Sequence, residues 1–359
     1  MKKIVVLIVL ALTLSVLASC EASNSIKLFM PTEYIDESLL DAFEEEYGVK
    51  VELVVFDSNE VAIPQVEDQS NRYDLVVPSD YAIEELAVKG LLETIDWSRI
   101  NMTKDVLDPS ITELWPDCGC DPADFNILNY SVPYFFGNFG ILYDSTKITL
   151  EELETHGWNA LNAYEKDVMF YDSTRDMIMV ALKSLYGGDV DINNPTDAQL
   201  QAAEAWLIGQ DRNSNVTYAT DEVFDAMLVS GSTQYAMALT YSGDAVYLMD
   251  ENEDLGYYVP ASGTNVWLDA FVIPKNAPNK DAAYDFINFM TSFDNMLLNT
   301  EYVGYTAPRT DVINDVITNE TYAEASYRMV VRTNDSIFRY NTDLKVKMAE
   351  LWARVRATN

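Results

Sequence analysis

Histidine is almost absent from this 359-residue chain, and cysteine is rare. The one histidine, His156, lies in a Thr-His-Gly-Trp segment typical of a surface turn, so a Ser-His-Asp or Cys-His arrangement would depend on one poorly placed residue. Cys118 and Cys120 could form a strained local disulfide or half a metal site, but no second cluster of cysteine or histidine completes one. A glycine-rich phosphate loop is missing too. We therefore expect no enzyme, no metal and no cofactor.

Basic residues are also scarce, with 23 lysines and arginines against 58 acidic residues and a formal net charge of −35. Nucleic acid is excluded as a partner, because phosphate binding needs concentrated lysine and arginine. An acidic surface attracts cations, although beyond about 8 Å this attraction is screened at physiological salt. Solubility alone explains most of these charges. Only carboxylates inside a cleft would give specificity.

A long apolar run occurs at the N-terminus, over residues 4–17, after Lys2 and Lys3. It is shorter than the ~20 apolar residues of a membrane span, so residues 1–20 are predicted to be a signal peptide. Its Leu-Ala-Ser-Cys ending resembles the lipobox of bacterial lipoproteins, in which the cysteine, here Cys20, carries the lipid. The alternative is an ordinary signal peptide in which Cys20 is incidental.

Few prolines and glycines, 12 and 14, and a 48% hydrophobic content predict a globular protein long enough for two domains. Strands predicted at 25–30, 49–56 and 74–77 alternate with helices that begin near Asp36 and Tyr81, which indicates a mainly parallel α/β sheet. Ligands bind beyond the carboxyl ends of such strands. Glu33, Tyr34, Ser79 and Tyr81 fall there.

A second set of elements follows an irregular segment at 97–130. Strands are predicted at 140–143, 168–171, 235–240 and 256–259, helices at 174–185, 197–208, 221–229 and 280–293, and a turn at 241–244. The segments at 131–137 and 265–274 are predicted to cross between two domains.

The second crossing carries Trp267 and Asp269, whose side chains share one face of a strand because they are two residues apart. A ring beside an anion suits an organic cation, whereas core and cap roles are the alternative for the pair. Carboxylates also lie close to aromatic residues at the other predicted strand ends. Their recurrence at loops that should converge on one cleft indicates a binding site.

Several of these stretches resemble the polyamine (spermidine/putrescine) substrate-binding proteins of bacterial ABC importers, from about Ser25 to the end of the chain. They are Thr32-Glu33-Tyr34-Ile35, Tyr73-Asp74-Leu75-Val76-Val77-Pro78-Ser79-Asp80-Tyr81, Val132-Pro133-Tyr134, Asp172-Ser173-Thr174-Arg175-Asp176, Ser242-Gly243-Asp244-Ala245, Trp267-Leu268-Asp269 and Gly304-Tyr305. The resemblance implies an α/β, two-lobed periplasmic-binding-protein-like fold of type II. Each lobe would be a mixed sheet flanked by helices, with the ligand cleft between the lobes. We expect residues 25–134 and 268–312 in lobe 1, and residues 135–267 and 313–359 in lobe 2.

The resemblance also implies which residues bind the ligand. The ammonium-binding acids would be Glu33, Asp176 and Asp269, the aromatic walls Tyr34, Tyr81, Tyr241, Trp267 and Tyr305, and a hydrogen-bonding neighbour Ser79. The chain departs from the family where Pro31 replaces a tryptophan and Ser173 replaces an acid of some spermidine binders. Three ammonium-binding acids match spermidine better than putrescine. Asp172 and Asp244 could change the number of these acids, so the preferred polyamine stays open.

The expected function is a monomeric, extracytoplasmic receptor, anchored to the membrane through lipid on Cys20. It would capture spermidine or putrescine and deliver it to an ABC permease. Three alternatives stay open: a receptor for another small organic cation or solute, a secreted hydrolase on the same lobes, and an adhesive lipoprotein that acts through its acidity alone.

Overall fold

The computed structural model describes residues 24–115, 125–212, 215–220 and 222–358. The predicted signal peptide, Cys20, Cys118 and Cys120 lie outside the described residues. Within those ranges, no helix combines the length and the apolar character needed to cross a membrane.

The first half of the sheet follows the predicted alternation of strands and helices. Strands β1 (Ser25–Pro31), β2 (Lys50–Phe56) and β3 (Leu75–Val76) are parallel, and helices α2 (Ser38–Tyr47), α3 (Asn59–Glu67) and α4 (Asp80–Val88) connect or follow them. Helix α2 ends at Gly48 with a φ of 66°, a backbone conformation that glycine adopts without strain. Strand β2 is an edge strand, and its Val55 is exposed.

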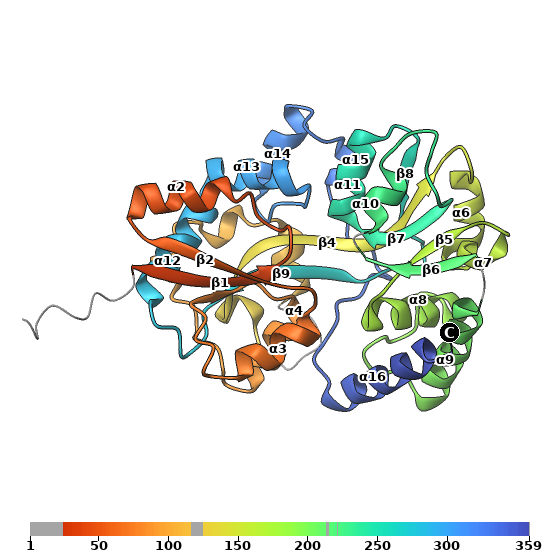
Figure 1. Cartoon of the computed structure of the whole chain (residues 1–359), viewed down its shortest axis with the longest axis horizontal. Coiled ribbons are helices and arrows are strands. Elements are labelled where there is room, and N and C mark those ends of the chain that lie inside the picture. The colour runs from red at the N-terminus through yellow and green to blue at the C-terminus, as the bar shows by residue number, and fades with distance from the viewer. Residues whose placement is uncertain (1–23, 116–124, 213–214, 221, 359) are drawn as a thin grey trace, which may run out of the picture.

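Two long strands run through the middle of the molecule and join its two halves (Figure 1). They are β4 (Ser131–Asp144) and β9 (Val266–Val272), every residue of which is buried, and they pair with each other in antiparallel register. They occupy the two segments predicted as crossings. The nine-stranded sheet has the order β2-β1-β3-β9-β4-β7-β5-β6, with β8 also on β4; here β5 is Val168–Tyr171, β6 Val216–Ala219, β7 Met237–Tyr241 and β8 Leu255–Tyr258. The first three strands, for which parallel pairing was predicted, are parallel. The pairings of β4 and β9 in the centre are antiparallel, so the sheet as a whole is mixed.

The second half carries parallel strands β5 (Val168–Tyr171), β6 (Val216–Ala219) and β7 (Met237–Tyr241), with β8 (Leu255–Tyr258) beside β4. Its helices are α6 (Leu150–His156), η4 (Gly157–Asn159), α7 (Ala160–Ala163), α8 (Thr174–Tyr186), α9 (Asp197–Asp211), α10 (Glu222–Met227) and α11 (Ser242–Glu251). The turn predicted at 241–244 is wrong. Tyr241 ends β7, and residues 242–244 begin α11, because the serine, glycine and aspartate that mark turns also favour helix N-termini.

The irregular segment contains the short helices η1 (Trp97–Arg99), η2 (Lys104–Val106), α5 (Pro109–Leu114) and η3 (Ile127–Asn129). The chain then closes through α12 (Lys280–Met290), α13 (Phe293–Val303), α14 (Thr310–Thr318), α15 (Glu324–Tyr327) and α16 (Thr342–Arg356). The single helix predicted over 280–293 therefore ends at Met290, and α13 begins at Phe293 after Thr291 and Ser292.

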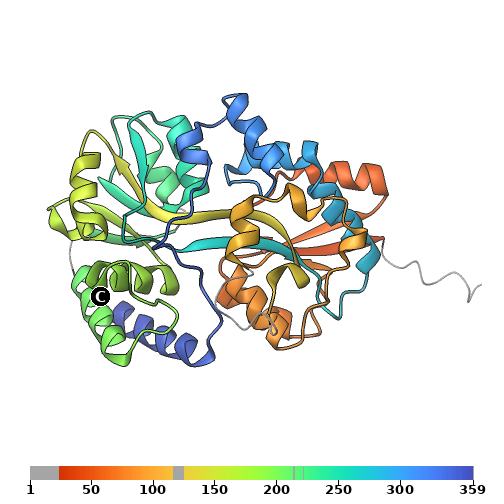
Figure 2. The same cartoon turned by 180° about the vertical axis from the view of Figure 1, so that it is seen from behind.

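The segment from Arg328 to Asn341 runs between the two halves toward α16 (Figure 2). The buried ammonium of Lys183 donates hydrogen bonds to the carbonyl oxygens of Ser262 and Asn334, at 3.2 and 2.9 Å. Gly263 has a φ of 83°, and a Cβ added there would stand 1.8 Å from the carbonyl oxygen of Asn334. This segment therefore packs directly on the backbone that leads into β9.

This contact predicts that Gly263→Ala destabilises the protein by about 1 kcal/mol or more beyond the effect of an unfavourable φ, because the methyl overlaps the backbone of the segment. Gly187→Ala is the matched control, since Gly187 has a φ of 78° and no atom within 4 Å of an added Cβ. Urea unfolding of both variants measures the difference. Equal losses of stability would contradict this view of the contact.

Candidate functional site

The predicted site residues come from strands and loops of both halves of the sheet. Tyr34 and Ser79 follow β1 and β3, Asp176 lies in the first turn of α8, and Tyr241 ends β7. Trp267 and Asp269 belong to β9, and Tyr305 follows α13 after Gly304. All of these side chains are buried except those of Tyr241 and Ser79, which are half-buried.

Four of the predicted aromatic residues form a continuous row of edge-to-face contacts. The ring centroids lie 5.3 Å apart from Tyr34 to Tyr305, 5.3 Å from Tyr305 to Trp267 and 5.8 Å from Trp267 to Tyr241. The structure thus brings together aromatic residues that are more than 200 positions apart in the sequence. Such contacts have well-defined geometry, so they hold the rings in place.

One buried carboxylate lies at the Tyr34 end of this row. The Tyr34 hydroxyl donates a hydrogen bond of 2.9 Å to Oδ2 of Asp269, while Oδ1 is buried without a hydrogen-bond partner among the described residues. Burial raises the pKa of Asp269 to about 6, against the opposing effects of the neighbouring Ser79 and of the hydrogen bond from Tyr34. The indole Nε1 of Trp267 is likewise buried and has no partner within the described ranges.

A second buried carboxylate lies at the Tyr241 end. Oδ2 of Asp176 accepts hydrogen bonds from the hydroxyls of Ser173, at 2.6 Å, and Tyr241, at 2.9 Å. Its Oδ1 is buried, and no donor in the described part of the chain reaches it. Burial raises the pKa of Asp176 above its ordinary value, although both hydroxyls oppose the shift. Each end of the row therefore presents one carboxylate oxygen that still needs a donor.

Asp244 fixes one of the rings, and it was not among the predicted binding residues. The Tyr305 hydroxyl donates to its Oδ1 at 2.7 Å, and the Thr240 hydroxyl donates to its Oδ2 at 3.0 Å. The ring of Tyr305 also lies against Gly243, where an added Cβ would stand 2.2 Å from the ring. Trp267 packs in the same way on Gly137, where a Cβ would stand 2.6 Å from the indole.

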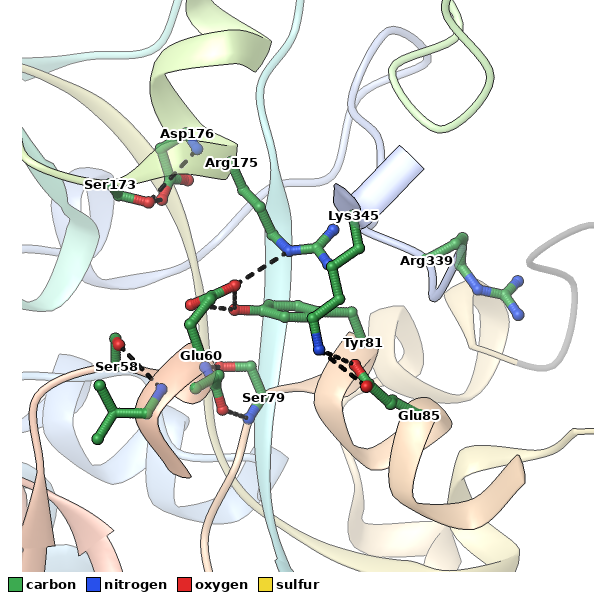
Figure 3. Close-up of polar contacts among 12 residues, drawn as sticks. Ser58, Glu60, Ser79, Tyr81, Glu85, Ser173, Arg175, Asp176, Arg339 and Lys345 are labelled. Carbon is green, nitrogen blue, oxygen red and sulfur yellow. Dashed lines mark hydrogen bonds and ion pairs between the residues drawn. The ribbon is translucent and has the colours of Figure 1, made fainter. Parts of the chain in front are cut away.

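Glu33 and Tyr81 differ from what the resemblance implied. Glu33 is exposed with a φ of 53°, and it takes no part in the hydrogen bonds of Asp176 and Asp269. The Tyr81 hydroxyl donates to Glu60 at 3.2 Å, and the guanidinium carbon of Arg175 lies 4.0 Å from the centroid of the Tyr81 ring (Figure 3). Tyr81 is thus occupied by partners within the chain. Ser79 accepts a 2.8 Å hydrogen bond from Asn59 and forms a backbone bridge with Asp269.

Two residues of this region, Glu60 and Arg175, were missed in the sequence. Nε of Arg175 lies 3.4 Å from Oε1 of Glu60, although the residues are 115 positions apart. The only local signal was that Arg175 directly precedes Asp176. Among the described residues, no group of three or more histidine, cysteine, aspartate or glutamate side chains could hold a metal ion. His156 is exposed at the end of α6.

Comparison with known proteins places this chain in a family. The model of the bacterial extracellular solute-binding proteins matches residues 38–327. The spermidine/putrescine-binding periplasmic protein of Escherichia coli K12 is 27% identical over 298 residues, which is 81% of this chain and 79% of that protein. The putrescine-binding periplasmic protein SpuD of Pseudomonas aeruginosa is 27% identical over 338 residues, or 87% of each chain.

A solved structure gives the same result for the fold. The spermidine/putrescine ABC transporter substrate-binding protein PotD from Streptococcus pneumoniae superposes with a TM-score of 0.74 at 28% identity, covering 93% of this chain and 99% of that one. The predicted fold class, an α/β periplasmic-binding-protein-like fold with two lobes, is thereby confirmed. With a family model that spans most of its length and a fold that agrees, the chain belongs to the bacterial extracellular solute-binding proteins.

Proposed function

We propose that this protein captures a polyamine, spermidine or putrescine, between two lobes outside the cytoplasm and delivers it to an ABC permease. One observation carries the proposal: two buried carboxylates, Asp176 and Asp269, each keep one oxygen without a described donor at the two ends of a row of aromatic rings. The names of the relatives agree with it, since they bind spermidine or putrescine or belong to such a transporter.

The chemistry of a polyamine fits this arrangement. An ammonium about 4 Å from a carboxylate gains roughly 4 kcal/mol at an effective dielectric constant of 20, before desolvation is subtracted. Each aromatic face adds roughly 0.5–2 kcal/mol as a cation–π contact and covers methylene groups as well. An uncharged solute would leave both carboxylates buried without a cation, which is costly. The site therefore selects for positive charge at both ends.

The binding set that we propose consists of Tyr34, Ser79, Asp176, Tyr241, Trp267, Asp269 and Tyr305, with Glu33 and Tyr81 at its margin. Lobe 1 would comprise residues 25–134 and 268–312, and lobe 2 residues 135–267 and 313–359. The protein would act as a monomer, held at the membrane by lipid on Cys20. The Leu-Ala-Ser-Cys segment supports this anchor.

A ligand panel tests the proposed function. Thermal unfolding of the chain from residue 21 onward should show stabilisation by putrescine or spermidine, worth about 2.7 kcal/mol when the ligand is present at about 100 times its dissociation constant. Cadaverine and spermine show how far the site tolerates a change in ligand length. Lysine, which carries a carboxylate, should not shift the unfolding temperature. Stabilisation by none of the amines would refute the proposal.

Asp176 and Asp269 should each be required for polyamine binding. Asp176→Asn and Asp269→Asn keep the shape of the side chain but remove its charge, so each should weaken polyamine binding about tenfold or more, as should Trp267→Ala. Asp172→Asn is the control, because Asp172 lies four residues before Asp176 but is exposed. Calorimetric titration gives the dissociation constants, and circular dichroism verifies folding. Wild-type affinity in both acid variants would exclude them as ligands.

Binding should weaken as the pH falls through about 6. The ligand needs Asp269 ionised, and the pKa of this carboxyl in the free protein is about 6. Affinity should therefore drop about tenfold between about pH 7.5 and about pH 5. The effect of Asp269 on the stability of the ligand-free protein has the opposite sign: its contribution should become more favourable as the pH falls. A raised pKa means that the folded state binds this proton more tightly, so the cost of burying the charge is relieved as the pH falls.

Titrations at several pH values, repeated with Asp269→Asn, check this expectation. The variant should have a flatter profile, because it has lost the group that titrates. A wild-type affinity that is constant down to about pH 5 would show that Asp269 does not need its charge for binding.

A further inference from the structure

Tyr34 is held at its backbone by a hydroxyl group from the central strand β4. The hydroxyl of Tyr134 donates a hydrogen bond of 2.7 Å to the main-chain carbonyl oxygen of Tyr34, and the two rings pack edge to face with their centroids 5.5 Å apart. Phe135, the next residue of β4, contacts the Tyr34 ring at 5.4 Å between centroids. Both residues of β4 are buried. The central strand therefore fixes the backbone and the ring of Tyr34 together.

A buried amide on α13 holds Tyr134 in turn. Nδ2 of Asn299 donates to the Tyr134 hydroxyl oxygen at 2.7 Å, and Oδ1 of Asn299 accepts a 2.9 Å hydrogen bond from the backbone amide of Asp36. The side chain of Asn299 thus binds the loop of Tyr34 twice, once through Tyr134 and once directly. Glu33 in this loop has a φ of 53°, which is unfavourable for a residue other than glycine, so neighbouring groups must hold the loop in place.

The next residue of α13 holds a second tyrosine of the aromatic row. The buried hydroxyl of Thr300 donates to the main-chain carbonyl oxygen of Tyr305. The rings of Tyr34 and Tyr305 lie 5.3 Å apart, and the hydroxyl of each donates to a carboxylate, Asp269 and Asp244 respectively. Asparagine and threonine side chains are mostly exposed in proteins. Two adjacent buried ones in α13 therefore need a reason, and the backbones of these two tyrosines supply it.

We propose that Asn299 and Tyr134 are positioning residues, which hold the Tyr34 hydroxyl on Oδ2 of Asp269 so that Oδ1 of this carboxylate is presented to a ligand ammonium. This relay, from Asn299 to Tyr134 to Tyr34, joins α13 and β4 to the acid of β9. The inference rests on the proposed polyamine function, because it names residues that act on the ligand through Asp269. Each member of the relay is the hydrogen-bond partner of the next, so removing one leaves a buried polar group without a partner, which is costly.

The ionisation of Asp269 reports on the relay. A hydroxyl that donates to a carboxylate stabilises its charged form, so the Tyr34 hydroxyl opposes the increase in pKa that burial causes. Tyr134 itself and Asp80, at the start of α4, also interact electrostatically with Asp269. The carboxylate of Asp80 accepts its hydrogen bonds from groups outside the relay. Loss of the relay should therefore reach Asp269 through the hydroxyl of Tyr34.

The test removes single hydroxyl groups from full-length mature protein, isotope-labelled at its aspartate carboxyl carbons, and follows Asp269 by NMR titration. Asp269→Asn assigns the signal. Tyr134→Phe keeps the ring but frees the backbone of Tyr34, so the titration midpoint of Asp269 should move upward by about one pH unit, in the direction given by Tyr34→Phe. Polyamine affinity at about pH 7.5 should fall about fivefold, and its decline with falling pH should begin at a higher pH.

A double variant separates positioning from a general loss of structure. Once Tyr34→Phe has removed the hydroxyl at the carboxylate, adding Tyr134→Phe should move the midpoint no further. Asn299→Ala should act like Tyr134→Phe. Tyr322→Phe is the matched control, because it removes a buried hydroxyl that donates to a main-chain carbonyl of α13, that of Glu301 at 2.8 Å. This variant should lower stability in urea unfolding and leave the midpoint unchanged.

The outcomes separate the relay from the polyamine function. If wild type binds neither putrescine nor spermidine, the proposed function is refuted, while the NMR titration still decides whether Tyr134 holds Tyr34 on Asp269. If wild type binds a polyamine but Tyr134→Phe leaves the midpoint unchanged, or moves it equally when Tyr34→Phe is present, the relay is overturned and the polyamine function stands. Should Asn299→Ala not fold, Tyr134→Phe still decides, since it removes one oxygen atom and keeps the ring.

Discussion

The proposed binding site depends on two buried carboxylates that form no ion pair with a described side chain. Asp176 and Asp269 each accept hydrogen bonds from hydroxyl groups on Oδ2 and leave Oδ1 without a described donor. A neutral hydroxyl orients a carboxylate but offsets only part of the cost of removing it from water, and burial accordingly raises the pKa of both groups. Under the proposed function, a ligand would bring a cation to each Oδ1, so that the site would select for charge before it selects for shape.

Rigid elements set the positions of these two groups. Asp269 lies in β9, which is buried throughout and pairs with β4 along the centre of the molecule. The rings between the carboxylates approach the backbone so closely that glycine is required beneath them: Gly137 under Trp267 and Gly243 under Tyr305. With such contacts the aromatic wall has little freedom to adapt. Under the proposed function, discrimination between amines would then come from the positions of the anions.

The elements of the fold were predictable from local patterns, whereas the partners of the site residues were not. Two-residue spacing placed Trp267 and Asp269 together, and their position in a buried strand followed from the apolar run around them. Nothing local indicated that Arg175 would cover Tyr81, because Glu60 and Tyr81 come from α3 and α4, about a hundred positions away. Nor did any local pattern indicate that Glu33 would be exposed, with a φ of 53°. The periodicity of apolar residues indicates which face of a helix or strand is buried. Which distant segments pair with each other depends on the whole fold.

Other buried acids show what a structural carboxylate needs in this chain. Glu84, on α4, accepts hydrogen bonds from Nε of Arg339 at 2.8 Å and from the backbone of Tyr340 at 2.9 Å, and Glu85 is held by Lys345 at 2.8 Å. Asp74 accepts from the backbone amides of Lys27 and Asn279, at 2.9 and 2.7 Å, one on each oxygen.

Cations or N–H donors therefore serve the acids that hold the fold together, even though the chain has only 23 basic residues for 58 acids. Asp176 and Asp269 receive hydroxyl donors on one oxygen alone. With unfolding free energies typically of about 5–15 kcal/mol, leaving two such charges without a cation costs a substantial part of a protein's stability. Under the proposed function, the binding of a cation accounts for that cost.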